Sequence, residues 1–532
     1  MENLIEKDKS IENMIRYAID LAGNEGKFQK IIFTILIIAS FISSLTVTIT
    51  PFHKELPNYF CFNLHEFQDD NEYDIYKNNN NYMIFYDEDC IIKHCSNNPN
   101  FVNERLTVLV AEYSKLENFV TELNIFCEID SYFNVFSQYI FIGRLLGLIV
   151  FSYISDKYGR LQSFNIMVYS LFLCYLAYFF LKEKFLFFVI GMISNSCMFL
   201  WNLVCLKSTE MMSERLYNLA NSLISTAFSL TGIINIIFMY LFSNWNDILL
   251  SQIFIIIILL YLTKIYMIET TSFLLIDKRY DKLAKTIEFI SSKNNDRIKH
   301  KQVLNELKKI KHKLNINMKL KDDNLSIKEK NAVGSFIEIF RSALGPYLII
   351  FNSFRSVLNI VQILIPYTTS IFIYYGQLFF IEEIPGSIYF NLMLVFTAEV
   401  IFELLSGQLL LMMEKKTILT LSFLLSTLGC FVVYMFDNEF IKLAMLFLVT
   451  MCNSINFVAM SVFMSDNFEV SVKSTSSSLV SLLSNMYMMF SARIIYLFGS
   501  SYLAFGVFSI IATLNMVIIK DKKFNAGGEG FH

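Results

Sequence analysis

The chain has 532 residues, of which 55 % are hydrophobic and only 17 % are charged, against about 25 % charged residues in an average soluble domain. Such a composition excludes an ordinary water-soluble surface, and the net charge of −3 gives no basis for binding nucleic acid. A bilayer core about 30 Å thick is crossed by about 20 apolar residues in a helix. Stretches of that length without Asp, Glu, Lys or Arg are predicted as membrane spans; they cover residues 162–181, 185–206, 216–242, 417–436 and 500–519.

Seven further apolar stretches complete a set of twelve predicted spans. They cover residues 31–50, 131–155, 248–267, 346–376, 387–413, 440–465 and 474–499. The first follows a charged segment and is itself long enough to span the membrane, so it is predicted as a membrane helix and not as a cleaved signal peptide. The fold class is therefore an all-α membrane protein of two six-helix bundles. The predicted parts are an N-terminal segment 1–30, a bundle 31–276, a linker 277–345, a bundle 346–519 and a tail 520–532.

The distribution of Lys and Arg orients the spans. Short loops on the side of the N-terminus hold most of these residues, which is typical of the cytoplasmic side. Both termini are then cytoplasmic, and the plasma membrane is the default location.

Two long loops interrupt the pattern. The loop 52–130 is predicted outside, is rich in acidic residues, and holds four of the nine cysteines: Cys61, Cys90, Cys95 and Cys127. Because they share one oxidising compartment, two disulfides are expected, with the pairing open among three possibilities. The linker 277–345 is rich in Lys and Arg, and we expect it to contact anionic lipid.

A charged turn follows the second span. It runs from Gly147 to Asp156, Lys157, Gly159 and Arg160. Glycine permits a tight turn, and the aspartate can cap the next helix while it pairs with an arginine. Such a cluster can act as a latch that joins the two bundles in one conformation and releases them in another.

This turn resembles the loop signature of the major facilitator superfamily, and its surroundings resemble the organic cation, organic anion and carnitine transporter family. The resemblance extends over nearly the whole chain and includes Gly26–Gln29, the segment 121–127 ending in Cys127, Glu210 with Arg215, Tyr374–Gly376, Ile388–Asn391 with Glu399, and Glu269–Leu275. It implies twelve helices around a central site, with Glu210 and Arg215 belonging to the latch.

The sequence departs from that family where the latch is concerned. Ser272 and Asn246 stand where the family has arginine, and the second copy of the loop signature is reduced to Glu414, Lys415 and Lys416. We therefore expect a weaker latch on an unchanged fold.

Charges inside spans cost about 2.5–3.5 kcal/mol each on insertion scales, so each needs a reason. Glu399 and Glu403 lie four residues apart on one helix face, where they can contact substrate or pair with a cation such as Arg355. Arg144 is interpreted as structural, and Arg493 as reaching the membrane surface.

Four uncharged residues complete the candidate substrate site. Trp201, Tyr374 and Tyr375 offer aromatic faces that suit a quaternary ammonium group. Asn485 falls, by the resemblance, where relatives carry a charge that selects between cations and anions.

The sequence thus favours an alternating-access carrier of a small organic ion, with a cation or carnitine-like zwitterion preferred over an anion. No motif for an enzyme, a metal or a cofactor is present. A sugar transporter of the same superfamily and a receptor or scaffold that no longer transports are the alternatives. The expected partners are the substrate, membrane lipid and, as an open question, a coupling ion; the expected state is a monomer.

Overall fold

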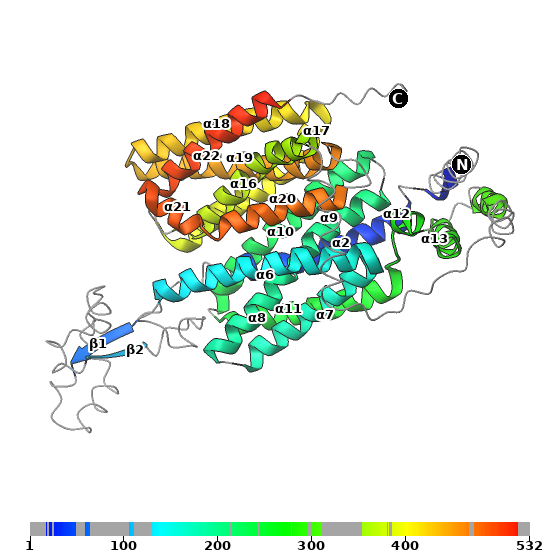
Figure 1. Ribbon diagram of the computed structural model, residues 1–532. Helices are drawn as coiled ribbons and strands as arrows, with labels where there is room; N and C mark the ends of the chain where they lie inside the picture. The colour runs from blue at the N-terminus through cyan, green and yellow to red at the C-terminus, as the bar shows by residue number, and fades with distance from the viewer. Residues whose placement is uncertain are drawn as a thin grey trace.

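The structure, a computed structural model, is almost entirely helical (Figure 1). The described residues are 17–18, 21–23, 26–48, 59–63, 106–110, 129–181, 183–212, 214–242, 244–277, 279–294, 300–310, 354–379, 381, 386–467 and 473–519. Two layers of long helices lie side by side, the first half of the chain in one and the second half in the other (Figure 1). This confirms the predicted all-α membrane fold of two bundles.

The first bundle contains six spans, of which the fourth is broken. Cys197 and Met198 form a turn between α8 and α9, although neither proline nor glycine stands there. The helices are α2 (Lys27–Thr48), α6 (Ile129–Tyr158), α7 (Arg160–Phe180), α8 (Lys184–Ser196), α9 (Phe199–Met211), α10 (Glu214–Phe242) and α11 (Trp245–Tyr266).

The second bundle repeats this count, with the break in its fifth span at Met489 and Phe490. Ten helical stretches of the described residues are long and apolar enough to cross a membrane, and α16 and the broken pair α20–α21 complete the twelve. The helices are α16 (Phe354–Phe379), α17 (Ile388–Met412), α18 (Lys415–Met435), α19 (Glu439–Asn467), α20 (Lys473–Met488), α21 (Ser491–Phe498) and α22 (Ser501–Ile518).

Two smaller parts mark the ends of the molecule. The helices α12 (Thr271–Ile276) and α13 (Tyr280–Lys293) lie at one end, which we call the linker end. At the opposite or hairpin end, β1 (Tyr59–Asn63) pairs antiparallel with β2 (Leu106–Val110) (Figure 1). This small hairpin is a departure from the all-α expectation.

The predicted disulfides lie outside the described residues. Cys61 is placed only by its backbone, opposite Val108 in the hairpin, and Cys90, Cys95 and Cys127 are not described. The five cysteines of the membrane helices are free thiols: Cys174, Cys197, Cys205, Cys430 and Cys452.

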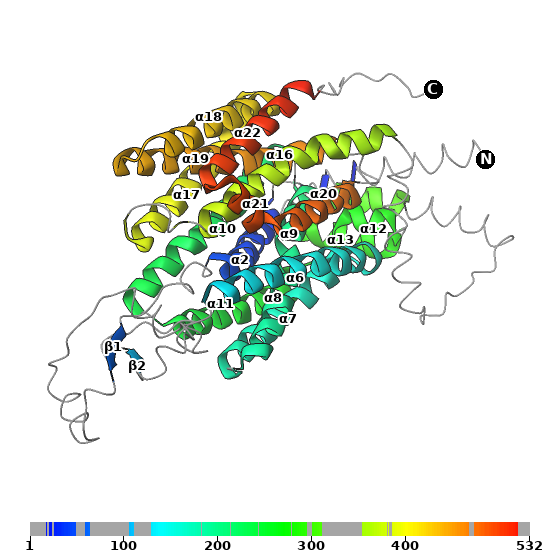
Figure 2. The same cartoon turned by 60° about the vertical axis from the view of Figure 1, so that its left-hand side comes forward.

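In the described part of the chain, the most extensive contacts between the two bundles are those of α10 with α17 and of α6 with α20 (Figure 2). The pair α10–α17 is antiparallel. The Ser222 hydroxyl donates to the Glu403 carbonyl oxygen at 2.5 Å, and nearer the hairpin end the Tyr240 and Tyr389 rings lie 6.1 Å apart. Gly232 lies between these two contacts along α10 and faces the Phe396 ring. A Cβ atom at position 232 would come within 2.5 Å of this ring. Small residues on α10 thus let the two helices approach closely.

A second close approach lies within the first bundle. A Cβ at Gly143 would come within 2.3 Å of the Met192 carbonyl oxygen, and one at Gly147 within 2.0 Å of that of Ser196. These two glycines, one turn apart on α6, therefore let α8 pack directly against the helix backbone. This packing holds α6 beside the break in the fourth span.

Candidate functional site

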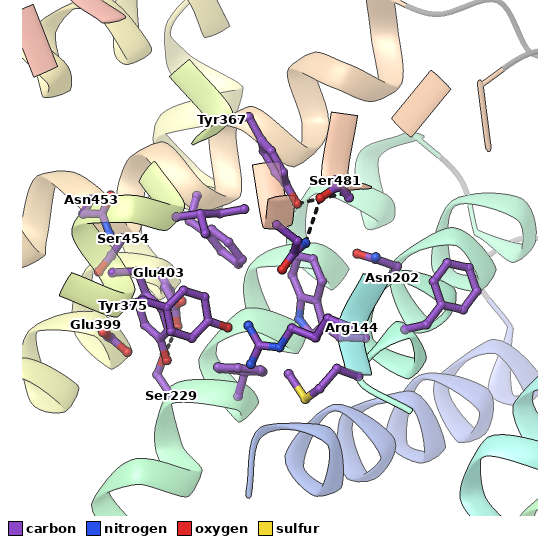
Figure 3. Close-up of a pocket in the computed structure, with 18 of the residues that line it drawn as sticks. Arg144, Asn202, Ser229, Tyr367, Tyr375, Glu399, Glu403, Asn453, Ser454 and Ser481 are labelled. Carbon is purple, nitrogen blue, oxygen red and sulfur yellow. Dashed lines mark hydrogen bonds between the residues drawn. The ribbon is translucent and has the colours of Figure 1, made fainter. Parts of the chain in front are cut away.

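A cavity lies between the two bundles and encloses about 870 Å³ of space not filled by protein atoms, its open mouth included (Figure 3). Both bundles supply its walls. The residues that line it are Arg144, Leu148, Met198, Phe199, Trp201, Asn202, Phe228 and Ser229 from the first bundle, and Tyr367, Ile371, Tyr374, Tyr375, Glu399, Glu403, Asn453, Ser454, Phe457, Ser481 and Asn485 from the second.

Arg144 is the one cation that lines the cavity among the described residues. Its side chain is buried, and its guanidinium carbon lies 4.6 Å from the Tyr375 ring centre and 5.5 Å from that of Phe141. Its Nε and Nη2 atoms are buried and have no hydrogen-bond partner within the described part of the chain. A buried guanidinium with free N–H groups is suited to bind an anionic group of a ligand.

Glu399 and Glu403 face the same cavity from α17, and both are about 95 % buried, with exposed fractions of 4 % and 5 %. The Ser229 hydroxyl, from α10, donates to Glu403 Oε2 at 2.9 Å, and Figure 3 shows the three side chains grouped on one side of the cavity. Glu399 Oε2 is buried and accepts no hydrogen bond from the described residues. It is an acceptor available to a cationic group.

Two aromatic contacts join the two bundles near the cavity. On the side of the hairpin end, the Phe141 ring of α6 meets the Tyr375 ring of α16 edge to face, with centroids 5.5 Å apart. On the side of the linker end, Trp201 of α9 lies 5.1 Å from Phe457 of α19. Both ring pairs therefore join the two bundles beside the cavity.

Further polar atoms turned toward this space are also unsatisfied. Trp201 Nε1, the Tyr374 hydroxyl and Asn453 Oδ1 are buried without a hydrogen-bond partner among the described residues. Buried polar groups are normally paired, so a cluster of unpaired ones indicates a ligand site.

Six of the seven predicted substrate-site residues line this cavity: Trp201, Tyr374, Tyr375, Glu399, Glu403 and Asn485. Asn485 donates to the Ser481 carbonyl oxygen at 2.7 Å. Arg355 is the second residue of α16, about 18 Å along the helix from Tyr367, the first residue of α16 in the cavity wall. Its side chain is not described, so its pairing with the glutamates stays a prediction.

Arg144 was interpreted as structural and was not among the predicted substrate-site residues. Its charge within a span was visible, but an isolated sequence does not show whether such a charge faces a cavity or a neighbouring helix. The structure places it in the cavity wall. Arg493, by contrast, is exposed on α21, as its interpretation required.

The charged turn between α6 and α7 forms a cluster around Arg160. Its Nη1 lies 3.3 Å from Asp156 Oδ1, and its Nε lies 3.4 Å from Glu210 Oε1. Gly159 has a φ of +114°, in the region that favours glycine, so the tight turn does require this residue. Lys157 is exposed and donates to the Tyr153 hydroxyl at 2.6 Å.

The cap of α7 differs from the expectation. Glu269, not Asp156, accepts from the backbone N–H of Arg160 at 3.0 Å and from that of Leu161 at 3.1 Å. A carboxylate at a helix N-terminus is favourable because it meets unpaired N–H groups and the positive end of the helix dipole. Asp156 is instead only an ion-pair partner of Arg160.

The latch as predicted is not assembled across the bundles in the described residues. The acidic partners of Arg160, namely Asp156, Glu210 and Glu269, all belong to the first bundle. The Arg215 side chain is not described. Gly147 lies about 18 Å along α6 from Gly159, in the packing against α8. The cluster therefore braces one bundle internally.

The sequence matches no protein-family profile and no curated protein. Solved structures do match. That of the human organic anion transporter MFSD10 (TETRAN) has a TM-score of 0.58 at 10 % identity, over 92 % of this chain and 99 % of that one. The proton:xylose symporter XylE bound to 6-bromo-6-deoxy-D-glucose has a TM-score of 0.59 at 13 % identity, over 92 % and 95 %. The chain has the major facilitator fold. XylE from E. coli in a partially occluded inward-open conformation matches over 95 % of this chain, with a TM-score of 0.58.

At identities this low the likeness shows the fold alone. These neighbours do not single out the organic cation and carnitine family, so that finer resemblance stays a prediction. The cavity itself must supply the argument about the substrate.

Proposed function

We propose that this protein is an alternating-access carrier of a small organic solute with an ammonium group, and that a zwitterion of the carnitine type fits its cavity best. The observation that carries the proposal is the presence, in one cavity, of buried groups of both charges that have no hydrogen-bond partner among the described residues: Nε and Nη2 of Arg144 and Oε2 of Glu399. A zwitterion satisfies both, because its carboxylate can bind the guanidinium while its ammonium lies beside the carboxyl pair.

The aromatic lining supports the ammonium part of the proposal. Trp201, Tyr374 and Phe457 surround the same space, with the Tyr374 and Phe457 rings stacked at 6.5 Å. Aromatic faces attract quaternary ammonium groups, with a gain of about 0.5–2 kcal/mol per good contact. A simple cation would use this wall and the glutamates but would leave Arg144 unpaired.

The main alternative is a sugar or another neutral polyol. Asn202, Asn453, Ser454 and Asn485 offer the amide and hydroxyl groups that a sugar requires, and one structural neighbour is a xylose symporter. A neutral solute, however, gives no reason for three buried ionisable side chains. A receptor or scaffold on this fold is the remaining alternative, and it predicts binding without uptake.

Uptake into proteoliposomes separates these functions. Glycine betaine and choline form a matched pair, since they share the trimethylammonium group and only the former carries a carboxylate. We expect uptake of glycine betaine above that of choline, and little uptake of para-aminohippurate or glucose. Glucose as the best substrate would establish the sugar alternative, and binding of any probe without uptake would establish the receptor.

Two variants with matched controls test the site. Glu399→Gln and Arg144→Gln should each lower betaine uptake by about 10- to 100-fold, since each removes a charged hydrogen bond of about 1.5–3 kcal/mol. Arg144→Gln should affect choline far less than betaine. The exposed residues Glu439 and Arg493 supply the controls, Glu439→Gln and Arg493→Gln, which should retain uptake. Equal loss in a variant and its control would contradict the site.

A further inference from the structure

The carboxyl pair that faces the cavity also belongs to the interface between the bundles. Glu403 is bound twice by α10: its carbonyl oxygen accepts from Ser222 at 2.5 Å, and its side chain accepts from Ser229 at 2.9 Å. Glu399 lies one turn away on the same face of α17, with one free oxygen. The side-chain donor that α10 gives to the pair, the Ser229 hydroxyl, is thus neutral and does not balance its charge.

Neighbouring helices place polar or charged side chains in the cavity wall that contains this pair. On α10 the facing group is the Ser229 hydroxyl, on α19 the Asn453 and Ser454 side chains, and on α16 the Tyr374 and Tyr375 phenols. Arg144 of α6 is the one cation in the described cavity wall. None of the described ion pairs joins it to Glu399 or Glu403.

The charge count of the empty cavity is therefore unbalanced if both glutamates are ionised. Two carboxylates and one guanidinium leave a net charge of −1 on three buried side chains, where unbalanced charge is costly. Two carboxyl groups that share a buried site commonly share a proton, as the repulsion between adjacent negative charges requires. One proton on the pair makes the net charge of the empty cavity zero.

We infer that the Glu399–Glu403 pair binds one proton in the empty carrier, and that a substrate with a single net positive charge displaces it. The inference rests on the proposed function for its transport consequence, but not for the presence of the proton. In the exchange, one carboxyl O–H bond breaks, the proton passes to water on the open side, and the ammonium group takes its place beside two carboxylates. On the other side of the membrane the steps reverse.

The same balance of charge in the cavity predicts that monovalent cations and zwitterions differ in whether a proton moves during their transport. A monovalent cation replaces the proton and keeps the cavity neutral, so cation and proton move in opposite directions with a one-to-one ratio. A zwitterion brings its own carboxylate to Arg144 and adds no net charge, so the proton stays on the pair and does not move with the solute.

Infrared difference spectroscopy of the purified full-length protein at neutral pH tests for the proton without any substrate. We expect the C=O stretching band of a protonated carboxyl group, shifted in D₂O, that is lost in the double variant Glu399→Gln/Glu403→Gln and kept in Glu439→Gln. If the double variant does not fold, the two single variants are compared in the same way. A neutral-pH spectrum in which these replacements remove no such band would overturn the inference.

Proteoliposomes that hold a pH-sensitive dye test the exchange. Choline uptake should be driven by an acidic interior and should alkalinise it, whereas glycine betaine uptake should leave the internal pH unchanged. Choline uptake without proton counterflow would overturn the exchange while the proposed function stands. Absence of uptake for every probe would overturn the proposed function. The infrared spectrum would still show whether the Glu399–Glu403 pair binds a proton.

Discussion

The guanidinium carbon of Arg144 lies 4.6 Å from the ring centre of Tyr375, so a buried cation of the first bundle is held against an aromatic ring of the second. The Tyr375 ring also meets Phe141 edge to face at 5.5 Å. One side chain thus both contacts the candidate anion-binding group and joins the two bundles beside the cavity. The guanidinium can bind a carboxylate through its in-plane N–H groups while its face stays against this ring, so the contact holds Arg144 in place for the substrate.

Tyr375→Leu should therefore impair transport far more than Tyr375→Phe. Leucine removes a cation–π contact worth about 0.5–2 kcal/mol, so uptake of a carboxylate-bearing substrate should fall by about 2- to 30-fold. Phenylalanine keeps the aromatic face. Initial rates normalised to the amount of reconstituted protein provide the measurement. If both variants lose uptake to the same extent, the phenol hydroxyl and not the ring is what matters.

Gly147→Ala should destabilise the fold, because the added methyl group would lie 2.0 Å from the Ser196 carbonyl oxygen. Overpacking of this kind typically costs about 1–3 kcal/mol, and here backbone must move to relieve it. Gly506→Ala is the matched control, since its nearest neighbour is the edge of the Phe431 ring at 3.3 Å. Thermal denaturation in detergent should show a lower midpoint for the Gly147 variant than for the control. Equal midpoints would show that α6 and α8 can separate freely.

Glu269→Gln should lower the thermal stability of the first bundle. The carboxylate accepts from the first two N–H groups of α7, and loss of a charged cap costs about 0.5–2 kcal/mol. Glutamine keeps the size of the side chain but loses the charge that favours the helix N-terminus. The fluorescence melting curve of the purified variant should shift to lower temperature. Recovery by Glu269→Asp is not expected, because the shorter side chain would not reach both N–H groups.

Asp156→Asn should leave stability nearly unchanged and slow transport per molecule at the surface. The Asp156 side chain is 45 % exposed and lies 3.3 Å from Arg160, and exposed ion pairs contribute only about 0–1 kcal/mol. Its charge nevertheless helps to position Arg160 at the turn that must move as the bundles rock. Surface biotinylation alongside uptake separates the two effects. Unchanged uptake per surface molecule would show that Glu210 alone suffices for Arg160.

Much of the fold could be predicted because a bilayer imposes a simple rule on sequence. Charge-free stretches of span length become helices, and these correspond to α7, α10, α18 and α22 within a few residues. The breaks between α8 and α9 and between α20 and α21 could not be predicted, because Cys197–Met198 and Met489–Phe490 are not helix-breaking residues. The first break lies beside Gly147, so packing at a distance in sequence determines it.

Some features of the candidate site could likewise be predicted from the sequence, and others could not. The spacing of Glu399 and Glu403 placed them on one face from the sequence alone, since helix geometry is local. The role of Glu269 was not predictable, because it caps a helix that begins 109 residues earlier in the chain. Arg144 was visible as a buried charge, but only the position of α16 shows that its partner is the Tyr375 ring and not a carboxylate.

The serine-rich contact of α10 with α17 has a consequence for experiments on this protein. Ser222 and Ser229 hold Glu403 at the contact between the two bundles, which would move in the proposed transport cycle, while the Glu403 side chain also lines the cavity. The same few atoms would therefore affect both the movement of the two bundles against each other and the binding of a solute in the cavity. A loss of turnover at Ser229 or Glu403 cannot by itself be assigned to weaker binding or to slower rocking. A distance measured between spin labels on the two bundles, taken with the solute present and absent, reads the motion separately from the binding.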